Sequence, residues 1–181
     1  MTRLNYHYKN IILPEMIERF TYVNTSNLPK LEKIVLNWSF RHNNFNTKYV
    51  SAYFTALEVL TGQRPNLVLS TKSNATLKIR KNFPLAYKVT LRGQKMFQFL
   101  DMLVTTLMPR IKYFQGLSLK SFSDLGNYTF TVHDPLNFLE LEPEFVKFSV
   151  LGPLDITFVF KNSSPEETLS LLTAFQIPFE D

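Results

Sequence analysis

Residues 85–108 read LAYKVTLRGQKMFQFLDMLVTTLM, and this stretch indicates how the chain folds. In residues 85–91, Leu, Tyr, Val and Leu alternate with Ala, Lys and Thr, which is typical of a strand with one apolar and one polar face. Gly93 then starts a helix over residues 94–108, which Pro109 is expected to stop. A strand of this kind predicts a sheet with one packed face and one accessible face.

On either side of this stretch, the predicted helices and strands do not alternate regularly. The pattern predicts helices over residues 6–20, 47–61 and 165–175, strands over residues 31–37, 66–71, 128–132 and 154–160, and an irregular acidic segment over residues 135–143. Because no βαβ repeat is evident, we expect a single α+β domain over residues 1–181 with a mostly antiparallel sheet. Helices would pack on one face of this sheet, and the other face would be open for a ligand.

The composition excludes several kinds of chemistry. The 181 residues contain no Cys, which excludes disulfides, thiolate zinc sites, iron–sulfur clusters and cysteine nucleophiles. The three His residues stand far apart in the sequence, so we expect no metal site. The most apolar stretch, residues 96–108, is interrupted by Gln, Asp and Thr and falls short of a membrane span.

The charges are unevenly distributed along the chain. The formal net charge is +5, but residues 1–123 carry 18 basic and 5 acidic side chains, whereas residues 124–181 carry 2 and 10. Within residues 64–120 there are 11 basic side chains and one acidic side chain. Cations at this density repel one another unless phosphates offset them, so the pattern predicts an RNA-binding surface and a separate acidic surface. The alternative is ordinary solubilising charge.

Two groups of residues leave an enzyme as an alternative. His133 and Asp134 are neighbours, but adjacent strand residues point to opposite faces, so they do not easily form a base and its orienting acid. The acids Glu140, Glu142 and Glu144 resemble a metal-ligand run, although such runs are more often solvated or partner-facing. No phosphate-cradle, zincin or nucleophile-elbow motif occurs. We therefore expect a non-enzyme with no catalytic residue, cofactor or metal.

Short motifs follow one another in order along nearly the whole chain. They are LPKLEKIVLN (28–37), TGQRP (61–65), LKIR (77–80), KVTLRG (88–93), PRI (109–111), FQGLSLKSF (114–122), GNY (126–128), LDIT (154–157) and LLTAF (171–175). In this order and spacing they resemble the universal large-subunit ribosomal protein L-five family, the 5S rRNA-binding protein of the central protuberance. The resemblance implies a structural ribosomal protein and not an enzyme.

The resemblance also implies where 5S rRNA, or a divergent equivalent, would bind. The family's polar cluster on the sheet falls here on Asn37, Gln63, Thr90, Arg92 and Gly93, and Lys88 shares the polar face predicted for Thr90. Amide side chains offer both donors and acceptors, and glycine allows close approach of the backbone. The alternative for Asn37 and Gln63 is that they only cap the ends of a strand and a helix.

Further partners are implied by the same resemblance. An extended basic loop, residues 72–84, would contact P-site tRNA and large-subunit rRNA through Lys72, Lys78, Arg80 and Lys81. The acidic segment 124–144 would face a small-subunit head protein across an intersubunit bridge, and neighbouring large-subunit proteins would complete the surroundings. The alternative is a free RNA-binding regulator with the same fold.

The amino-acid usage bears on the origin of the protein. Phe occurs 17 times and Asn 14 times, whereas Gly and Ala occur five times each. Phe and Asn have AT-rich codons and Gly and Ala have GC-rich ones, so the usage predicts a genome under AT pressure. We expect a mitochondrial protein of the matrix ribosome, with a plastid or the cytoplasm of an AT-rich bacterium as alternatives.

Overall fold

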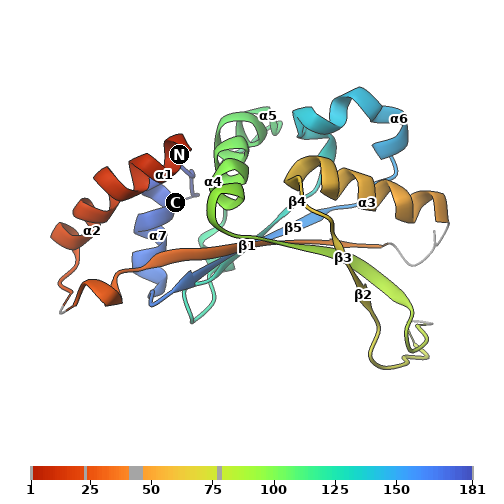
Figure 1. The fold of residues 1–181 in the computed structure, drawn as a ribbon, viewed down its shortest axis with the longest axis horizontal. Helices are drawn as coiled ribbons and strands as arrows, with labels where there is room; N and C mark the ends of the chain where they lie inside the picture. The colour runs from red at the N-terminus through yellow and green to blue at the C-terminus, as the bar shows by residue number, and fades with distance from the viewer. Residues whose placement is uncertain (1, 23, 41–46, 77–78, 181) are drawn as a thin grey trace. The chain divides into compact units, whose positions relative to one another are not determined.

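The computed structural model describes residues 2–22, 24–40, 47–76 and 79–180. It contains a five-stranded, open antiparallel sheet (Figure 1). The order of the strands across the sheet is β2 (Asn66–Leu69), β3 (Pro84–Leu91), β1 (Lys30–Ser39), β5 (Leu154–Lys161) and β4 (Tyr128–Val132). The α+β class and the mostly antiparallel sheet expected from the sequence are confirmed.

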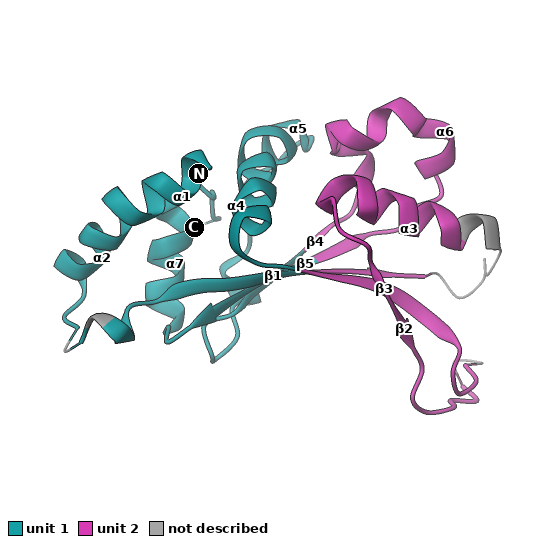
Figure 2. Ribbon diagram, viewed as in Figure 1, with its two compact units in different colours: residues 1–35, 91–130, 156–181 teal, residues 36–90, 131–155 magenta. Residues whose placement is uncertain are grey.

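The chain divides into two compact units, each assembled from segments that are distant in sequence (Figure 2). Unit 1 comprises residues 1–35, 91–130 and 156–181, and unit 2 comprises residues 36–90 and 131–155. The chain passes from one unit to the other only within strands β1, β3, β4 and β5. The single-domain organisation stays a prediction.

Burial alternates along the strands, as the period of two predicts. The inward-facing side chains are apolar; in β1 they are Ile34, Leu36 and Trp38, and in β5 they are Leu154, Ile156, Phe158 and Phe160. In unit 2 the helices lie on one side of the strands (Figure 2), and none of the described helices of that unit covers the opposite face. This arrangement leaves the polar face of the strands accessible.

Aromatic rings form much of the core of unit 1. Its helices are α1 (Arg3–His7), α2 (Leu13–Arg19), α4 (Gly93–Met102), α5 (Met108–Arg110) and α7 (Pro165–Ala174). The ring centroid of Tyr8 lies 5.9 Å from that of Phe97 and 5.7 Å from that of Phe175. Burial raises the pKa of the Tyr8 phenol to about 12, and its hydroxyl donates to the carbonyl of Pro29 at 3.2 Å. The first helix therefore packs against both α4 and the end of α7.

Two helical segments of unit 1 contain a π-helical turn just before a proline. Tyr8–Ile12 leads into α2, whose second residue is Pro14, and Leu103–Leu107 leads into α5, whose second residue is Pro109. Proline has no N–H for the carbonyl four residues earlier, and a widened turn accommodates this loss. Helical structure runs over residues 3–19, so the helix predicted over residues 6–20 is confirmed except at its two ends. The stop predicted at Pro109 is wrong, because helical structure continues to Arg110.

In unit 2, two aromatic side chains form hydrogen bonds with the backbone of Gly152. Its helices are α3 (Thr47–Thr61), which has the predicted bounds, and α6 (Phe145–Phe148). The indole N–H of Trp38 donates to the carbonyl of Gly152 at 2.8 Å, and the Gly152 N–H donates to the hydroxyl of Tyr53 at 3.0 Å. The two rings meet edge to face at 5.6 Å. These bonds fix the residues just before β5.

Local sequence predicts the start of α7 well but not the structure of residues 135–143. The predicted start of α7 at Pro165 is confirmed. Ser164, which precedes the helix, and Glu167, in its first turn, form a reciprocal capping box. The irregular structure predicted for residues 135–143 is wrong, because this segment forms the 3-10 turns Pro135–Asn137 and Leu139–Glu144. Asp134 caps the first of them by accepting the Leu136 N–H at 3.2 Å.

Candidate nucleic-acid interface

The open face of two adjacent strands carries three of the predicted RNA-binding residues. In unit 2, Lys88 and Thr90 alternate with buried positions of β3, so their side chains project to the face opposite the core. Asn37 is half-buried and lies between two buried residues of β1, the neighbour of β3 in the sheet. The structure therefore brings Asn37, Lys88 and Thr90 to one face.

Gln63, just beyond the end of α3, contacts the backbone of Thr90. Gly62 follows the helix in the left-handed conformation, φ +57°, which reverses the chain direction. The side-chain amide of Gln63 then donates to the carbonyl of Thr90 at 3.5 Å, while its backbone N–H donates to the hydroxyl of Thr61 at 3.2 Å. Gln63 thus completes the helix end, as the alternative suggested, and also contacts Thr90. We call Asn37, Gln63, Lys88 and Thr90 the sheet-face cluster.

Arg92 and Gly93 belong to unit 1 and stand at the start of α4. Arg92 has an extended backbone at the N-cap position, and Gly93 has φ +59°. The guanidinium of Arg92 donates through Nη1 to Oε1 of Glu32 at 2.7 Å, with 55% of the Arg92 side chain still exposed. This bond holds the pKa of the Glu32 carboxyl below its usual value. A Cβ at Gly93 would meet no atom within 4 Å, so another molecule has room to approach its backbone.

Sequence reasoning missed Glu32 as a neighbour of this predicted site. Glu32 and Arg92 are 60 residues apart, and the chain contains 15 acids and 20 bases that offer many other pairings. The one available signal is that Glu32 lies inside the LPKLEKIVLN motif. A pairing of this kind comes from strand neighbours and not from a local pattern.

The basic loop forms a hairpin between β2 and β3. Asn74 and Ile79 exchange backbone hydrogen bonds of 2.9 and 3.0 Å, and Ser70 pairs with the segment around Phe83. The predicted contact residues Lys72, Arg80 and Lys81 are exposed on this hairpin. The fourth, Lys78, lies outside the described residues. The hairpin extends the β2–β3 pair of unit 2 and so belongs to the same unit as the sheet-face cluster.

The acidic part of unit 2 combines carboxylates with exposed apolar side chains. Glu140, Glu142 and Glu144 are exposed, and Glu144 pairs with Lys147 at 2.8 Å. Directly after them, Phe145 is 57% and Val146 is 87% exposed. This combination is typical of a surface for another protein and not of one for nucleic acid.

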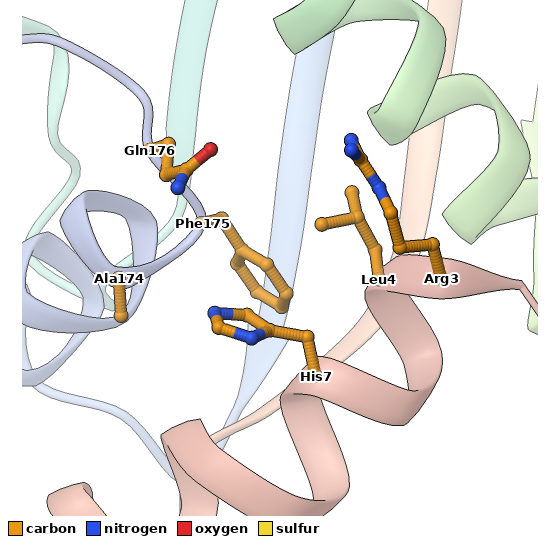
Figure 3. A pocket seen from close by; sticks show the side chains of 6 residues that line it. All are labelled: Arg3, Leu4, His7, Ala174, Phe175 and Gln176. Atoms are coloured by element: carbon orange, nitrogen blue, oxygen red, sulfur yellow. The ribbon is translucent and has the colours of Figure 1, made fainter.

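A small pocket lies elsewhere in unit 1. Its lining comes from α1 and from the end of α7 and comprises Arg3, Leu4, His7, Ala174, Phe175 and Gln176 (Figure 3). The Arg3 guanidinium pairs with Asp101 of α4 at 2.6 Å. None of the predicted RNA-binding residues lines this pocket.

The described part of the chain has neither a metal-binding cluster nor a membrane-spanning helix. No group of three or more His, Cys, Asp and Glu side chains there is arranged to hold a metal ion. Among the same residues, none of the helices combines the length and the apolar character that crossing a membrane requires.

Comparison with known proteins assigns the chain to a family. The model of the C-terminus of the ribosomal L5 protein family matches residues 84–179. Proteins called large ribosomal subunit protein uL5 from Macrococcus caseolyticus, Neisseria gonorrhoeae and Buchnera aphidicola are 39%, 38% and 37% identical to it over 180 residues. Each alignment covers 99% of this chain and 99% of the relative. The chain belongs to the ribosomal L5 family.

Membership of the ribosomal L5 family confirms the resemblance seen in the motifs. The family consists of structural ribosomal proteins and not of enzymes, so the enzyme alternative built on His133 and the acidic run is excluded. The three relatives are bacterial, which agrees with the bacterial alternative for the origin. The mitochondrial origin stays a prediction.

Proposed function

We propose that this L5-family protein is a structural constituent of the large ribosomal subunit that binds 5S rRNA or a divergent equivalent. The residues that bind it are Asn37, Gln63, Lys88, Thr90, Arg92 and Gly93. The observation that supports this most is the uncovered sheet face with Asn37, Lys88 and Thr90, whose Thr90 carbonyl accepts a hydrogen bond from the Gln63 amide. The relatives' name, large ribosomal subunit protein uL5, supports the same assembly.

The chemistry of these six residues suits a folded RNA. Lys88 and Arg92 supply charge for phosphate oxygens, which carry most of the affinity. Asn37, Gln63 and Thr90 offer hydrogen bonds to base edges and to ribose 2′-hydroxyls. At Gly93 the open space beside the backbone admits a phosphate close to the first turn of α4.

Two other surfaces extend the proposal to further partners. The hairpin loop contacts P-site tRNA and large-subunit rRNA through Lys72, Lys78, Arg80 and Lys81. The acidic segment, which includes Glu140, Glu142 and Glu144, faces a basic protein of the small-subunit head, because opposite charges favour that encounter. Neighbouring large-subunit proteins complete the contacts, and the site of action is the ribosome of a mitochondrion, a plastid or a bacterium.

Binding of purified protein to 5S rRNA at several salt concentrations tests the proposal. The affinity should fall steeply with salt, and Thr90→Ala combined with Arg92→Ala should weaken binding at every concentration. Because one phosphate contact is lost, the slope of log affinity against log salt should decrease by about 1. The matched control is Arg19→Ala with Thr173→Ala, which removes one exposed cation and one exposed hydroxyl from α2 and α7. Salt-independent binding, or an equal loss in the control, would contradict the proposal.

Sedimentation distinguishes the ribosomal role from that of a free regulator with the same fold. The protein should cosediment with the large subunit in a gradient and should be nearly absent from the light fractions. A protein found mainly in the light fractions, and bound there to messenger RNA, would favour the regulator.

A further inference from the structure

Among the large hydrophobic residues that the structure describes, Tyr113 is the most exposed, at 98%. It lies in the loop between α5 and the 3-10 turn Leu119–Ser121 of unit 1. Within the described residues its ring makes no aromatic contact and its hydroxyl no hydrogen bond. Burial therefore does not account for an aromatic residue at this position.

The backbone of Tyr113 is also unfavourable for its side chain. Its φ is +57°, in the left-handed region that Gly and Asn occupy more readily than Tyr does. A residue that contributes no packing and adopts this conformation adds nothing to folding. Such residues are more often found where a ligand binds.

Backbone bonds on both sides hold this loop in place. On one side, the Ile111 N–H donates to the carbonyl of Met108 at 3.3 Å. On the other side, the Leu117 N–H donates to the carbonyl of Pro178 at 2.9 Å, and the Glu180 N–H donates to the carbonyl of Leu117 at 3.0 Å. The loop can therefore present the Tyr113 ring to solvent without support from the ring itself.

The sequence on both sides of Tyr113 is basic. No Asp or Glu occurs between Asp101 and Asp124, and this interval contains Arg110, Lys112 and Lys120. All three cations are exposed. An exposed aromatic ring next to cations is the arrangement by which proteins bind unpaired nucleotides, since the ring stacks on a base while the cations contact phosphates.

We infer that Tyr113, together with Arg110 and Lys112, forms a second RNA contact that stacks on an unpaired base. The inference rests on the proposed function in that the ligand is ribosomal RNA, but it uses none of the six residues assigned to 5S rRNA. An acidic protein segment would also meet the cations. Such a segment would explain the uncovered aromatic ring less well than RNA, whose bases stack on such rings.

Substitutions at Tyr113 separate the ring from the backbone. Tyr113→Asn removes the ring and keeps a residue that tolerates a left-handed backbone, whereas Tyr113→Phe keeps the ring. The probe is a 12-nucleotide single-stranded oligouridylate, binding the full chain at low salt. Tyr113→Phe should bind within about twofold of the unchanged protein, and Tyr113→Asn should bind about fivefold to 150-fold more weakly, the range for loss of one stacked base. The melting temperature of Tyr113→Asn should equal or exceed that of the unchanged protein.

Crosslinking and the sheet-face variant distinguish this inference from the proposed function. Large-subunit rRNA carrying 5-iodouridine should crosslink to Tyr113. Unchanged oligouridylate binding by Tyr113→Asn, or a crosslink from Tyr113 to protein in the intact subunit, would overturn the inference. If Thr90→Ala with Arg92→Ala still loses 5S rRNA binding in that case, the proposed function survives. If instead the protein does not bind 5S rRNA but Tyr113 crosslinks to large-subunit rRNA, the inference holds and the proposed function fails.

Discussion

Nη1 of Arg92 lies 2.7 Å from Oε1 of Glu32, although 60 residues separate them in the chain. The pair joins the predicted RNA-binding cation at the start of α4 to an acid of β1. Arginine carries five N–H donors, so one bond to Glu32 leaves others for a phosphate. Glu32 therefore orients the guanidinium and at the same time places a negative charge next to the proposed RNA.

Replacing Glu32 with Gln should strengthen RNA binding at low salt. The amide keeps a hydrogen-bond acceptor for Arg92 but removes the charge that repels phosphate. We expect the dissociation constant for 5S rRNA to fall by about twofold to fivefold, the range for one exposed charge interaction, and the gain to shrink as salt screens it. Glu18→Gln, on the exposed side of α2, serves as the control. Weaker binding by Glu32→Gln would show instead that orienting Arg92 matters more than the charge.

The same pair predicts a pH dependence of stability. Because Arg92 lowers the pKa of Glu32 in the folded protein, the ionised carboxylate stabilises the fold above the ordinary pKa of 4.5. This contribution is lost as the pH falls through the lowered pKa. The difference in melting temperature between the unchanged protein and Glu32→Gln should therefore be present at neutral pH and disappear in acid below pH 4.5. A difference that is independent of pH would show that the pair does not contribute.

Tyr53→Phe should destabilise unit 2. The hydroxyl of Tyr53 accepts the buried Gly152 N–H, and its removal leaves that group without its partner. An unsatisfied buried donor costs about 1–3 kcal/mol of the free energy of unfolding, which urea denaturation measures. Tyr6→Phe, at a ring that is 62% exposed, should change stability by less than about 0.5 kcal/mol. Equal effects of the two substitutions would contradict the role given to Tyr53.

Two glycine substitutions should differ strongly in cost. A Cβ at Gly116 would lie 2.6 Å from the backbone of Phe179 and Glu180, at φ +129°, so Gly116→Ala should cost more than about 3 kcal/mol. At Gly62 a Cβ meets no atom within 4 Å, and Gly62→Ala should cost only about 1–2 kcal/mol for the left-handed backbone. Chemical denaturation compares them. A similar cost at both positions would mean that the C-terminal residues do not pack on Gly116.

Ser164→Ala should weaken the start of α7. The Ser164 hydroxyl accepts the Glu167 N–H at 3.3 Å, and the Glu167 carboxylate accepts the Ser164 N–H at 2.8 Å. Loss of such a cap costs about 0.5–2 kcal/mol, and Ser164→Asp should restore most of it because Asp is as good a cap. Thermal denaturation of the two variants decides the point. No difference between Ala and Asp would exclude a capping role.

Elements with strong local signals were predicted well. The helix α3 and the strand β4 have their predicted bounds, and α7 begins at its predicted first residue, Pro165. The acidic turns after Asp134 were missed, because short 3-10 turns lack a periodic pattern long enough to recognise. The helical continuation past Pro109 was missed as well, since a preceding π-helical turn accommodates the proline and no local pattern indicates one.

The sequence by itself determined the class of fold, the family, and the polar face of β3 on which Lys88 and Thr90 lie. Each of these follows from an alternation or an order of motifs along the chain. Only the tertiary structure decided that Gln63 contacts Thr90, that Glu32 pairs with Arg92, and that Tyr113 stands fully exposed. The physical reason is that strand pairing and loop anchoring bring together residues from distant segments. Neither their spacing nor their charge indicates such neighbours in advance.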